Sequence, residues 1–360
     1  MKYYMPVRVY DEAQCVSKHK EEIASYGNKA LIVTGRSSAE KCGALGDILS
    51  ALKEYGKEYA VYNRIEENPS VETIMDASAF GIAEKADFVI GIGGGSPLDA
   101  AKAIAFMIYR NSDNPDDLYD ASLPADALDV IAVPTTCGTG SEVTGVSVLT
   151  VHAKNTKISI PHKIFPKLAL IDGKYLMSAP HSMIVNTAVD AFAHMSESYL
   201  SKKADVYSQS AALTGLKLWA EVKDVLAEER EADAEDYAKL MRASTFGGIA
   251  IAQTGTSIPH ALSYILTYDQ KIPHGKAAGY FLGRFISFAD EADQKAILTA
   301  AGFASADELN AFLDRLFGEY EVPQETLQRA YDTVSANAVR MHGSRVDMDN
   351  EKLRVIVKLK

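Results

Sequence analysis

Short runs of β-branched and aliphatic residues alternate with helical patterns through the first half of the chain, and this alternation limits the possible folds most strongly. The predicted strands cover residues 30–34, 59–62, 87–92 and 129–133. Helical spacing covers residues 38–55, 71–84 and 97–109. Strands and helices in alternation form βαβ units, so the strands are expected to lie parallel in one sheet. Because ligands of such sheets bind where the strands end, binding residues are expected in the loops that follow the strands.

The second half of the chain differs from the first in its residue pattern. β-branched runs become scarce, and helical stretches rich in alanine and leucine occupy 186–200, 206–227, 234–253, 304–317 and 323–338. A hairpin from strands at 146–150 and 157–160 is predicted before this change, and residues 111–129 are predicted to form a surface loop. We therefore predict an α/β plus all-α protein, with a Rossmann-like parallel sheet in residues 1–180 and a helical domain in residues 181–360.

Composition excludes several classes of function. Lys and Arg number 37 against 48 Asp and Glu, and the net charge of −11 argues against a nucleic-acid partner, because phosphate binding needs surplus basic residues. The three cysteines form no CxxC pair, which fits a reducing compartment and excludes a zinc site built from several thiolates. Residues 1–10 do not resemble a signal peptide, and the most apolar stretch, 100–109, is too short to span a bilayer. We expect a cytoplasmic protein with no membrane partner.

A glycine-rich turn follows the third predicted strand. Gly93, Gly94 and Gly95 let the backbone approach a ligand closely and adopt positive φ. Ser96 is predicted to be the N-cap of the next helix, Pro97 its first residue, and Asp99 a capping-box acid. Free N–H groups at a helix N-terminus favour a pyrophosphate. The alternative is a tight turn without a ligand, and the absence of GxGxxG and of a GKS or GKT ending disfavours an ordinary Rossmann motif and a P-loop.

A second polar turn, from Pro134 to Thr144, follows the fourth predicted strand. Its threonines, serine and glycines are rich in hydrogen-bond donors. Because the fourth strand ends at the same edge of the sheet as the third, this turn is expected to face the same ligand. A solvated loop without a ligand remains the alternative.

Four residues of the second half suggest a metal site. Asp190 and His194 lie four residues apart and share one face of a predicted helix. His260 and His274 lie in further apolar helical contexts. One carboxylate and three imidazoles suit Fe(II) or Zn(II) and disfavour calcium and magnesium. A buried hydrogen-bonded Asp–His pair is the alternative, and His19, His152, His162, His181 and His342 are expected at the surface.

Several of these motifs, taken in order, resemble the iron-containing alcohol dehydrogenases, also called group III. The matching segments are GGGSPLD at 93–99, PTTCGTGSE at 134–142, DAFAH at 190–194 and HG at 274–275. The resemblance covers essentially the whole chain. It implies an architecture like that of dehydroquinate synthase, with a dinucleotide-binding domain in residues 1–180 and a helical metal-binding, catalytic domain in residues 181–360, and an active site between them. Relatives are usually dimers or larger, so a homodimer or larger homo-oligomer is expected.

The resemblance also assigns residues. Asp190, His194, His260 and His274 would hold one Fe(II), or Zn in some relatives, and form the catalytic centre. The residues expected to bind NAD(P)(H) are Gly35, Arg36, Ser37, Ser38, Asn68, Gly93, Gly94, Gly95, Ser96, Asp99, Thr135, Thr136, Thr139, Lys157 and Leu176.

Three positions depart from the family pattern. Many NAD-using relatives carry an aspartate after the first strand, where this chain has Gly35-Arg36-Ser37. An acid there accepts the ribose 2′-hydroxyl and repels a 2′-phosphate, so its replacement by Arg36 predicts NADP(H) over NAD(H), unless Arg36 simply points to water. Tyr264 replaces a histidine proposed as a proton relay, and Gly283 replaces a common proline.

The resemblance implies metal-assisted hydride transfer between NAD(P)(H) and a small primary alcohol or aldehyde, of the butanol, propanediol or lactaldehyde type. Phe246 and Ile249 are expected to line the substrate pocket. The alternatives are a dehydroquinate synthase-like lyase, a glycerol or glycerol-phosphate dehydrogenase, and a nucleotide-binding protein without catalysis. The lyase would need clustered basic residues, and only Lys271, Lys276 and Arg284 lie near the two later histidines in sequence.

Overall fold

A computed structural model describes residues 3–154, 156–318 and 320–359. Backbone contacts divide the chain into two compact units. The α/β unit contains residues 5–136 and 140–179. The helical unit contains residues 180–359 together with residues 3–4 and the short segment 137–139.

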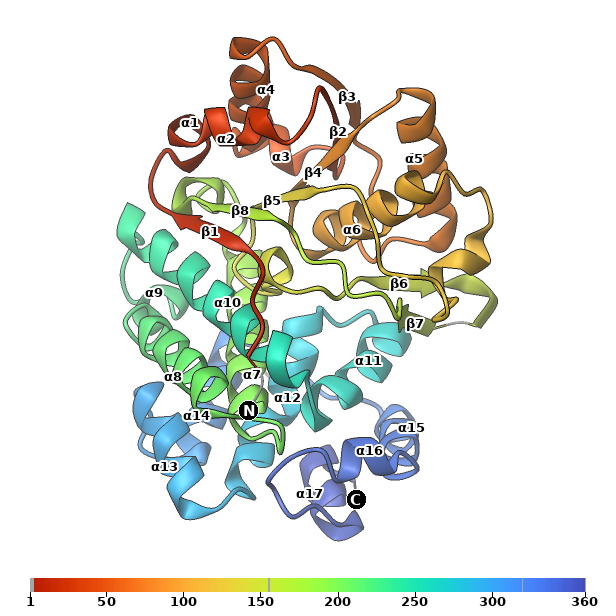
Figure 1. The fold of residues 1–360 in the computed structure, drawn as a ribbon. Coiled ribbons are helices and arrows are strands. Elements are labelled where there is room, and N and C mark those ends of the chain that lie inside the picture. The colour runs from red at the N-terminus through yellow and green to blue at the C-terminus, as the bar shows by residue number, and fades with distance from the viewer. Residues whose placement is uncertain (1–2, 155, 319, 360) are drawn as a thin grey trace. The chain divides into compact units, whose positions relative to one another are not determined.

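The α/β unit is built on one six-stranded sheet whose paired strands all run parallel (Figure 1). The order across the sheet is β1-β8-β5-β4-β2-β3. The strands are β1 (Arg8–Asp11), β2 (Lys29–Thr34), β3 (Glu58–Tyr62), β4 (Phe88–Gly93), β5 (Val130–Pro134) and β8 (Leu168–Ile171). The parallel-sheet fold class predicted from the sequence is confirmed.

Side chains of the central strands pack into two separate hydrophobic cores, one on each face of the sheet. Leu31 and Val33 of β2 belong to one apolar cluster, and Ala30 and Ile32 belong to the other. Alternate residues of a strand point to opposite faces, so a continuous apolar run indicates a strand that is covered on both sides. The first face carries α5 (Val71–Ala83) and α6 (Gly95–Arg110). The second carries α1 (Cys15–Lys18), α2 (Lys20–Ser25), α3 (Ser38–Lys41) and α4 (Ala44–Glu54) (Figure 1).

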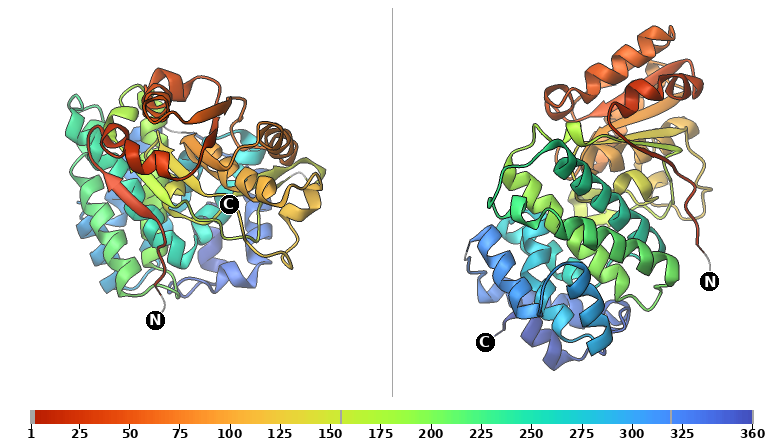
Figure 2. Two further views of the ribbon diagram at one scale, coloured as in Figure 1. Left: turned by 45° about the horizontal axis from the view of Figure 1, so that its top comes forward. Right: turned by 90° about the vertical axis from the view of Figure 1, so that its left-hand side faces the viewer.

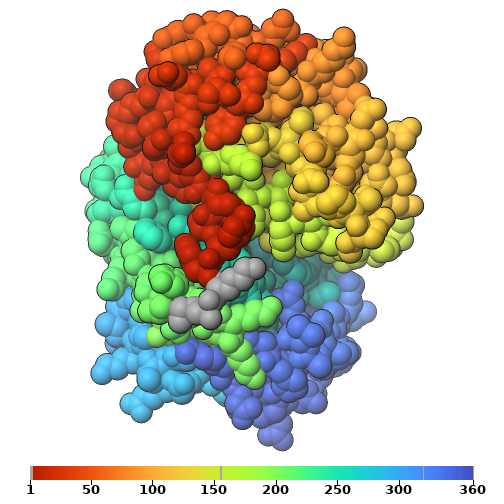
Figure 3. All heavy atoms as spheres, in the orientation of Figure 1, coloured from red at the N-terminus to blue at the C-terminus, as the bar shows by residue number. Residues whose placement is uncertain are grey.

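Two smaller features of this unit also match the prediction. β6 (Val148–Val151) and β7 (Thr156–Ser159) pair antiparallel as a hairpin, beside the short η3 (His152–Lys154). Residues 111–129 are mostly exposed and contain only η1 (Pro115–Leu118); their gold atoms lie at the surface on the right of Figure 3.

Other boundaries differ from the prediction. The single helix predicted at 38–55 is broken into α3 and α4 at Gly43, whose φ of 85° lies in the left-handed region. Strands β1 and β8 were not predicted, although β8 lies inside the sheet between β1 and β5. The four-residue β8 run is too short to show a period, and β1 is a half-exposed edge strand of mixed polarity.

The helical unit surrounds the long helix α7 (His181–Tyr199), which is buried without interruption from Ala188 to Ser198. Such a helix is stable only when other helices cover it. α7 contacts α8 (Val206–Ala220), α10 (Ala234–Thr254), α11 (Ile258–Gln270) and α12 (His274–Ser287). α8 and α10, drawn in green and teal, run side by side (Figure 2). The remaining elements are η2 (Ser141–Val143) and η4 (Gly173–Tyr175) in the α/β unit, and α9 (Lys223–Leu226), α13 (Glu291–Ala300), α14 (Ala306–Phe317), α15 (Gln324–Ser335), α16 (Ala338–Met341) and α17 (Asn350–Val357).

Within the described residues, no helix has both the length and the apolar character that crossing a bilayer requires.

Candidate metal centre and nucleotide turns

Three of the predicted metal ligands, all histidines, lie around one carboxylate oxygen of the fourth, Asp190. Asp190 Oδ1 lies 3.2 Å from His260 Nε2, 3.7 Å from His274 Nε2 and 3.8 Å from His194 Nε2. Asp190 and His194 come from successive turns of α7, whereas His260 lies in the first turn of α11 and His274 begins α12. The ligand atoms of Asp190, His260 and His274 all lie within 4.8 Å of one another, whereas His194 lies outside this mutual group and is linked to it by its 3.8 Å approach to Asp190.

These spacings fit a divalent metal. Ligand bonds of about 2.1 Å in a tetrahedral shell place neighbouring ligand atoms roughly 3.4 Å apart. The three separations from Asp190 Oδ1 bracket that length. Three nitrogens and one carboxylate oxygen are also a donor set that suits Fe(II) or Zn(II).

The outer side of each imidazole is held by a hydrogen-bond acceptor. His194 Nδ1 lies 3.2 Å from the carbonyl oxygen of Gly138, and His260 Nδ1 lies 2.5 Å from Glu197 Oε1. His274 Nδ1 lies 3.4 Å from Ser263 Oγ, whose own hydrogen is donated to the carbonyl of His260. A carbonyl, a carboxylate and a hydroxyl that already donates elsewhere can each accept, so each ring donates through Nδ1 and its Nε2 faces Asp190 Oδ1.

The electrostatics of the group favour an ionised carboxylate, and they act in opposite directions on His194 and His260. Burial by itself raises the pKa of Asp190, but His194, His274 and His260 outweigh burial, and the pKa lies well below its ordinary value. Burial lowers the pKa of His194, despite the opposing effect of Asp190. Burial also opposes protonation of His260, but Glu197 and Asp190 outweigh burial and raise the pKa of His260 well above its ordinary value, so a metal would have to displace a proton from this ring. A neutral imidazole and an ionised carboxylate are the forms that bind metal.

Two glycines allow the backbone to approach α7 closely enough to build this group. A Cβ on Gly275 would lie 1.8 Å from the carbonyl oxygen of Asn186 and 3.0 Å from the backbone nitrogen of Asp190. Gly275 therefore lets the start of α12 lie against α7, which brings His274 beside Asp190. A Cβ on Gly138 would lie 2.8 Å from the carbonyl oxygen of Thr187, so the residue that orients His194 also needs to be glycine.

The glycine-rich turn begins its helix earlier than predicted. Gly93 has a φ of 149°, Gly94 is the N-cap, and α6 starts at Gly95. The predicted N-cap role of Ser96 is wrong: its hydroxyl instead accepts from the backbone N–H of Asn68 at 3.0 Å. The first amides of α6 still lack helical partners and lie at the carboxyl end of β4, where an anion would be stabilised.

Asp99 does not form the predicted capping box either. Its carboxylate accepts from Ser141 Oγ at 2.5 Å and from the backbone N–H of Val148 at 2.9 Å. The Nζ of fully buried Lys102 lies 3.4 Å from Asp99 Oδ1 and donates to Ser141 Oγ at 2.7 Å and to the carbonyl of Val146 at 2.8 Å. Because α6 starts early, position 99 lies inside the helix and faces the second polar turn. Asp99 and Lys102 therefore hold α6, the helix that follows the glycine-rich turn, against the second polar turn.

The second polar turn follows β5, the neighbour of β4. A Cβ on Gly94 would lie 3.0 Å from Thr136 Oγ1, so the two turns are in close contact. Thr135 is buried and its backbone N–H donates to the carbonyl of Gly93 at 2.9 Å. Thr139 belongs to the segment that clusters with the helical unit.

The other predicted cofactor residues lie in three places. Gly35, Arg36, Ser37 and Ser38 directly follow β2, with the last three exposed. Asn68 has a φ of 57° and accepts from Lys157 Nζ at 2.7 Å through its side-chain oxygen. Leu176 follows η4 and is fully buried. Since β2, β4 and β5 are neighbours and parallel, the residues after these strands share one edge of the sheet.

Sequence reasoning missed Glu197, Gly138 and Lys102, which support the predicted residues. Glu197 could have been found, because positions 190, 194 and 197 recur at i, i+4 and i+7 on one face of a helix. Nothing in the local sequence indicates that the Gly138 carbonyl meets His194 or that Lys102 is buried.

Several secondary predictions can also be placed. His162 was expected at the surface but is buried. Its ring stacks on that of Phe106, with the ring centroids 4.1 Å apart. Tyr264 stacks on His274 with centroids 5.6 Å apart and ring planes 5° apart. A Cβ on Gly283 would meet the Asn310 side chain at 2.2 Å, so glycine makes room for α14 there. Phe246 and Ile249 are half-buried on α10, near Gly247, which packs beside His194.

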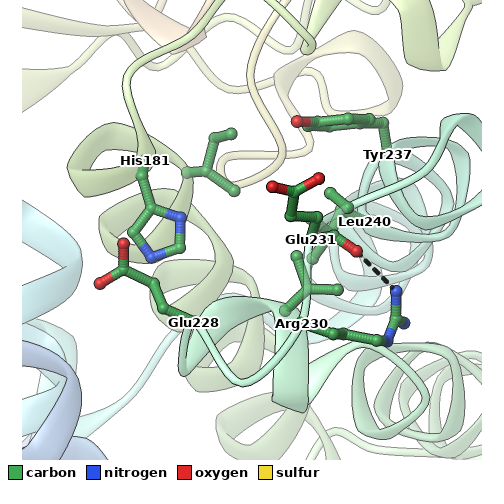
Figure 4. A pocket seen from close by; sticks show the side chains of 9 residues that line it. His181, Glu228, Arg230, Glu231, Tyr237 and Leu240 are labelled. Carbon is green, nitrogen blue, oxygen red and sulfur yellow. Dashed lines mark hydrogen bonds between the residues drawn. The ribbon is translucent and has the colours of Figure 1, made fainter.

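A hollow of about 580 Å³ also opens in the helical unit (Figure 4). Ile184 and Leu240 are among the residues that line it, and none of the four predicted metal ligands does. Figure 4 shows the His181 ring beside the Glu228 carboxylate. Arg230 also lines the hollow, but its guanidinium pairs with the carboxylates of Asp224 and Asp236.

Comparison with known proteins places both parts of the chain in one family. Residues 6–173 match the family model described as iron-containing alcohol dehydrogenase. Residues 184–359 match the model described as Fe-containing alcohol dehydrogenase family, C-terminal.

Individual relatives agree with these matches. The chain is 31% identical to long-chain primary alcohol dehydrogenase AdhA of Thermoanaerobacter ethanolicus, over 71% of this chain and 64% of that protein. It is 29% identical to an NADPH-dependent butanol dehydrogenase of Clostridium saccharobutylicum, over 73% of this chain and 68% of that one. The crystal structure of an iron-containing alcohol dehydrogenase from Thermotoga maritima is 33% identical, covers 99% of this chain and 98% of its own, and superposes with a TM-score of 0.90.

These matches confirm the resemblance inferred from the motifs, together with the fold class and the oxidoreductase class that it implied. The chain belongs to the family of iron-containing alcohol dehydrogenases.

Proposed function

We propose that this chain transfers a hydride between NAD(P)(H) and a small primary alcohol or aldehyde, with the help of one divalent metal. The observation that carries the proposal is the convergence of three imidazole Nε2 atoms on Asp190 Oδ1, at 3.2 to 3.8 Å. Relatives that act on long-chain primary alcohols and on butanol support the substrate class. A butanol-, propanediol- or lactaldehyde-type substrate is the narrower form of the proposal.

Asp190, His194, His260 and His274 would hold the metal and form the catalytic centre. When bound, the metal would act as a Lewis acid and lower the pKa of the substrate hydroxyl. Burial of Asp190, His194 and His260 keeps bulk water away from the reacting oxygen, which strengthens electrostatic stabilisation there. In the oxidative direction the alcohol carbon loses its C–H electron pair as hydride to the nicotinamide, and the hydroxyl proton leaves to solvent. The alcohol becomes an aldehyde and NAD(P)⁺ becomes NAD(P)H.

The dinucleotide would bind along the carboxyl edge of the sheet. Gly93 to Ser96 would bind the pyrophosphate through the amides that open α6, and Asp99, Thr135, Thr136 and Thr139 would support it. The remaining predicted cofactor residues, Gly35 to Ser38, Asn68, Lys157 and Leu176, complete the proposed site. Residues 1–180 would thus act as the dinucleotide-binding domain and residues 181–360 as the metal-binding, catalytic domain.

NADP(H) is proposed as the preferred cofactor. Arg36 is exposed after β2, and no ion pair is found for it within residues 3–154, 156–318 and 320–359, so its charge is available for a 2′-phosphate. The relative named as NADPH-dependent supports this choice.

Fe(II) is proposed as the native metal, with Zn(II) as a substitute. We also propose that the protein is cytoplasmic and forms a homodimer or a larger homo-oligomer.

The lyase alternative is disfavoured by the contacts of the basic residues that lie near His260 and His274 in the sequence. Lys271 Nζ donates to the carbonyl of Tyr268, Lys276 Nζ to that of Phe317, and Arg284 Nη1 to that of Tyr280. All three cations are thus engaged by backbone carbonyls. A phosphorylated acid would require them to be free at the metal site.

The test is reduction of an aldehyde panel by the metal-loaded chain, followed as oxidation of NADPH. Replacing His260 with alanine should reduce turnover to background while NADPH binding, measured by fluorescence, is retained, because His260 belongs to the metal group and is not among the proposed cofactor residues. His181→Ala on α7 is the matched control and should retain wild-type turnover, since His181 lies 3.2 Å from the Leu226 carbonyl and is no ligand. Unchanged turnover in H260A would contradict the proposed centre.

A further inference from the structure

Glu197 is a fully buried carboxylate for which neither the family resemblance nor the proposed reaction accounts. Its Oε1 accepts from His260 Nδ1 at 2.5 Å, and its Oε2 accepts from the backbone N–H of Ser257 at 2.5 Å. A buried charge is costly unless it is paired and hydrogen-bonded, so a carboxylate at this position needs a compensating role.

Both contacts act on one element, α11. Ser257 is the N-cap of α11, and its own side chain makes no capping bond. The carboxylate of Glu197 replaces that cap from a different helix, and the positive end of the α11 dipole stabilises its charge. The same carboxylate therefore fixes the start of α11 and the ring of His260, which projects from the first turn of that helix.

We propose that Glu197 is a positioning residue of the metal centre, which holds His260 with its proton on Nδ1 and its Nε2 lone pair directed at the metal. This inference rests on the proposed function. Hydrogen bonding of one ring nitrogen to a carboxylate fixes the tautomer of a histidine ligand and makes it a stronger donor.

The other two imidazoles are held differently. His194 faces the neutral carbonyl of Gly138, and His274 faces the neutral hydroxyl of Ser263. Glu197 is thus the charged partner among the three acceptors. Together with Asp190 it places two negative charges around the centre, enough to balance a divalent cation in a buried site.

The decisive variant is Glu197→Gln in the full chain. A glutamine cannot satisfy both contacts as the carboxylate does. If its amide donates to His260 Nδ1, the ring is driven into the tautomer that carries a proton on Nε2, and if its oxygen accepts from His260, the amide opposes the N–H of Ser257. Metal affinity should fall about 10- to 100-fold.

The measurement is Zn²⁺ affinity of the metal-free, full-length protein, by competition with a chromophoric chelator. The control is Asp236→Asn, which neutralises another buried carboxylate of the same unit, one that pairs with Arg230 and accepts from the backbone N–H of Asp233, the N-cap of α10. D236N should lower stability without contacting the centre, so its Zn²⁺ affinity should stay within about twofold of wild type.

A double variant separates positioning from general stabilisation. If Glu197 acts through His260, adding E197Q to H260A should produce no further loss of Zn²⁺ affinity, because the ring to be positioned is gone. Should E197Q fail to fold, Glu197→Asp retains the charge but cannot reach both partners, and its affinity should fall to an intermediate value.

Each result is decisive. Wild-type affinity in E197Q, or in E197D if E197Q is unfolded, would overturn the role of Glu197 while leaving the metal centre intact. Additive losses in the double variant would also overturn it. A wild-type chain without measurable Zn²⁺ affinity would refute the metal centre itself, and with it any role for Glu197.

Discussion

A single exposed guanidinium is proposed to decide which dinucleotide the chain prefers. Arg36 follows β2 at the edge of the sheet, next to Gly35 and two serines. A 2′-phosphate would gain charge-assisted hydrogen bonds from Arg36, whereas a bare 2′-hydroxyl would gain little. The preference for NADPH over NADH should therefore depend mainly on this residue.

Replacing Arg36 with alanine should raise KM for NADPH about tenfold and leave KM for NADH nearly unchanged. One charged hydrogen bond contributes about 1.5–3 kcal/mol, and 1.4 kcal/mol corresponds to a factor of about ten. Steady-state kinetics with both cofactors measure the change. Lys41→Ala, which removes another exposed cation of the same segment, should leave the ratio unaltered. An equal effect of R36A on both cofactors would refute the proposed contact.

At the scale of helices, the metal group depends on how closely two backbones approach. Gly275 at the start of α12 lies against α7, with no space for a side chain between it and Asn186. The His274-Gly275 pair of the sequence is thus explained by packing: the glycine permits the contact that brings the histidine to Asp190.

Gly275→Ala should therefore push α12 away from α7. Inserting a methyl group into a packed contact costs about 1–3 kcal/mol of unfolding free energy, and the displacement of His274 should weaken Zn²⁺ binding in the same variant. Urea unfolding and Zn²⁺ titration measure the two effects. Gly46→Ala on α4, where a Cβ meets nothing within 4 Å, should instead raise the unfolding free energy by about 0.5–1 kcal/mol. Wild-type Zn²⁺ affinity in G275A would contradict this account.

The elements that sequence reasoning predicts well are those with long periodic patterns. The buried strands β2, β4 and β5 are continuous apolar runs, and α10 is a long helix with a clear pattern. β8 was missed although it lies inside the sheet, because four apolar residues show no period. Local rules failed at Ser96 and Asp99, since the positive φ of Gly93 starts α6 earlier than a capping pattern indicates.

The candidate site is predictable only in part for a related reason. Asp190 and His194 share one helix face, so their proximity follows from spacing, whereas His260 and His274 were assigned through the family resemblance. The Gly138 carbonyl and the Lys102 ammonium group act through contacts between residues distant in sequence. Such contacts leave no local pattern.

On the scale of the whole molecule, the two units should respond differently to pH and to metal. All four proposed ligands belong to the helical unit. The α/β unit instead contains His162, a buried imidazole whose Nε2 donates to the carbonyl of Asp117 at 3.3 Å. Burial lowers the pKa of His162 below its ordinary value of 6.5.

Acidification should therefore destabilise the α/β unit through His162. The unfolded chain takes up a proton near pH 6.5 while the folded chain resists it, so the contribution is complete above pH 6.5 and is lost as pH falls below it. The loss should reach at most about 1.4 kcal/mol per pH unit. Urea unfolding between pH 7.5 and about pH 5 measures it. In His162→Gln, which keeps a donor for Asp117, the decline should be shallower; an unchanged pH profile would argue against His162 as its source.

The short segment 137–139 has a consequence for dissecting the protein. It clusters with the helical unit although the chain on both sides of it belongs to the other one, and its Gly138 carbonyl faces His194. A fragment cut at residue 180 would leave that carbonyl behind and free the His194 ring to rotate. The helical half expressed alone should thus be an incomplete metal binder, and the isolated domain is a poor substitute for the intact polypeptide in any metal titration.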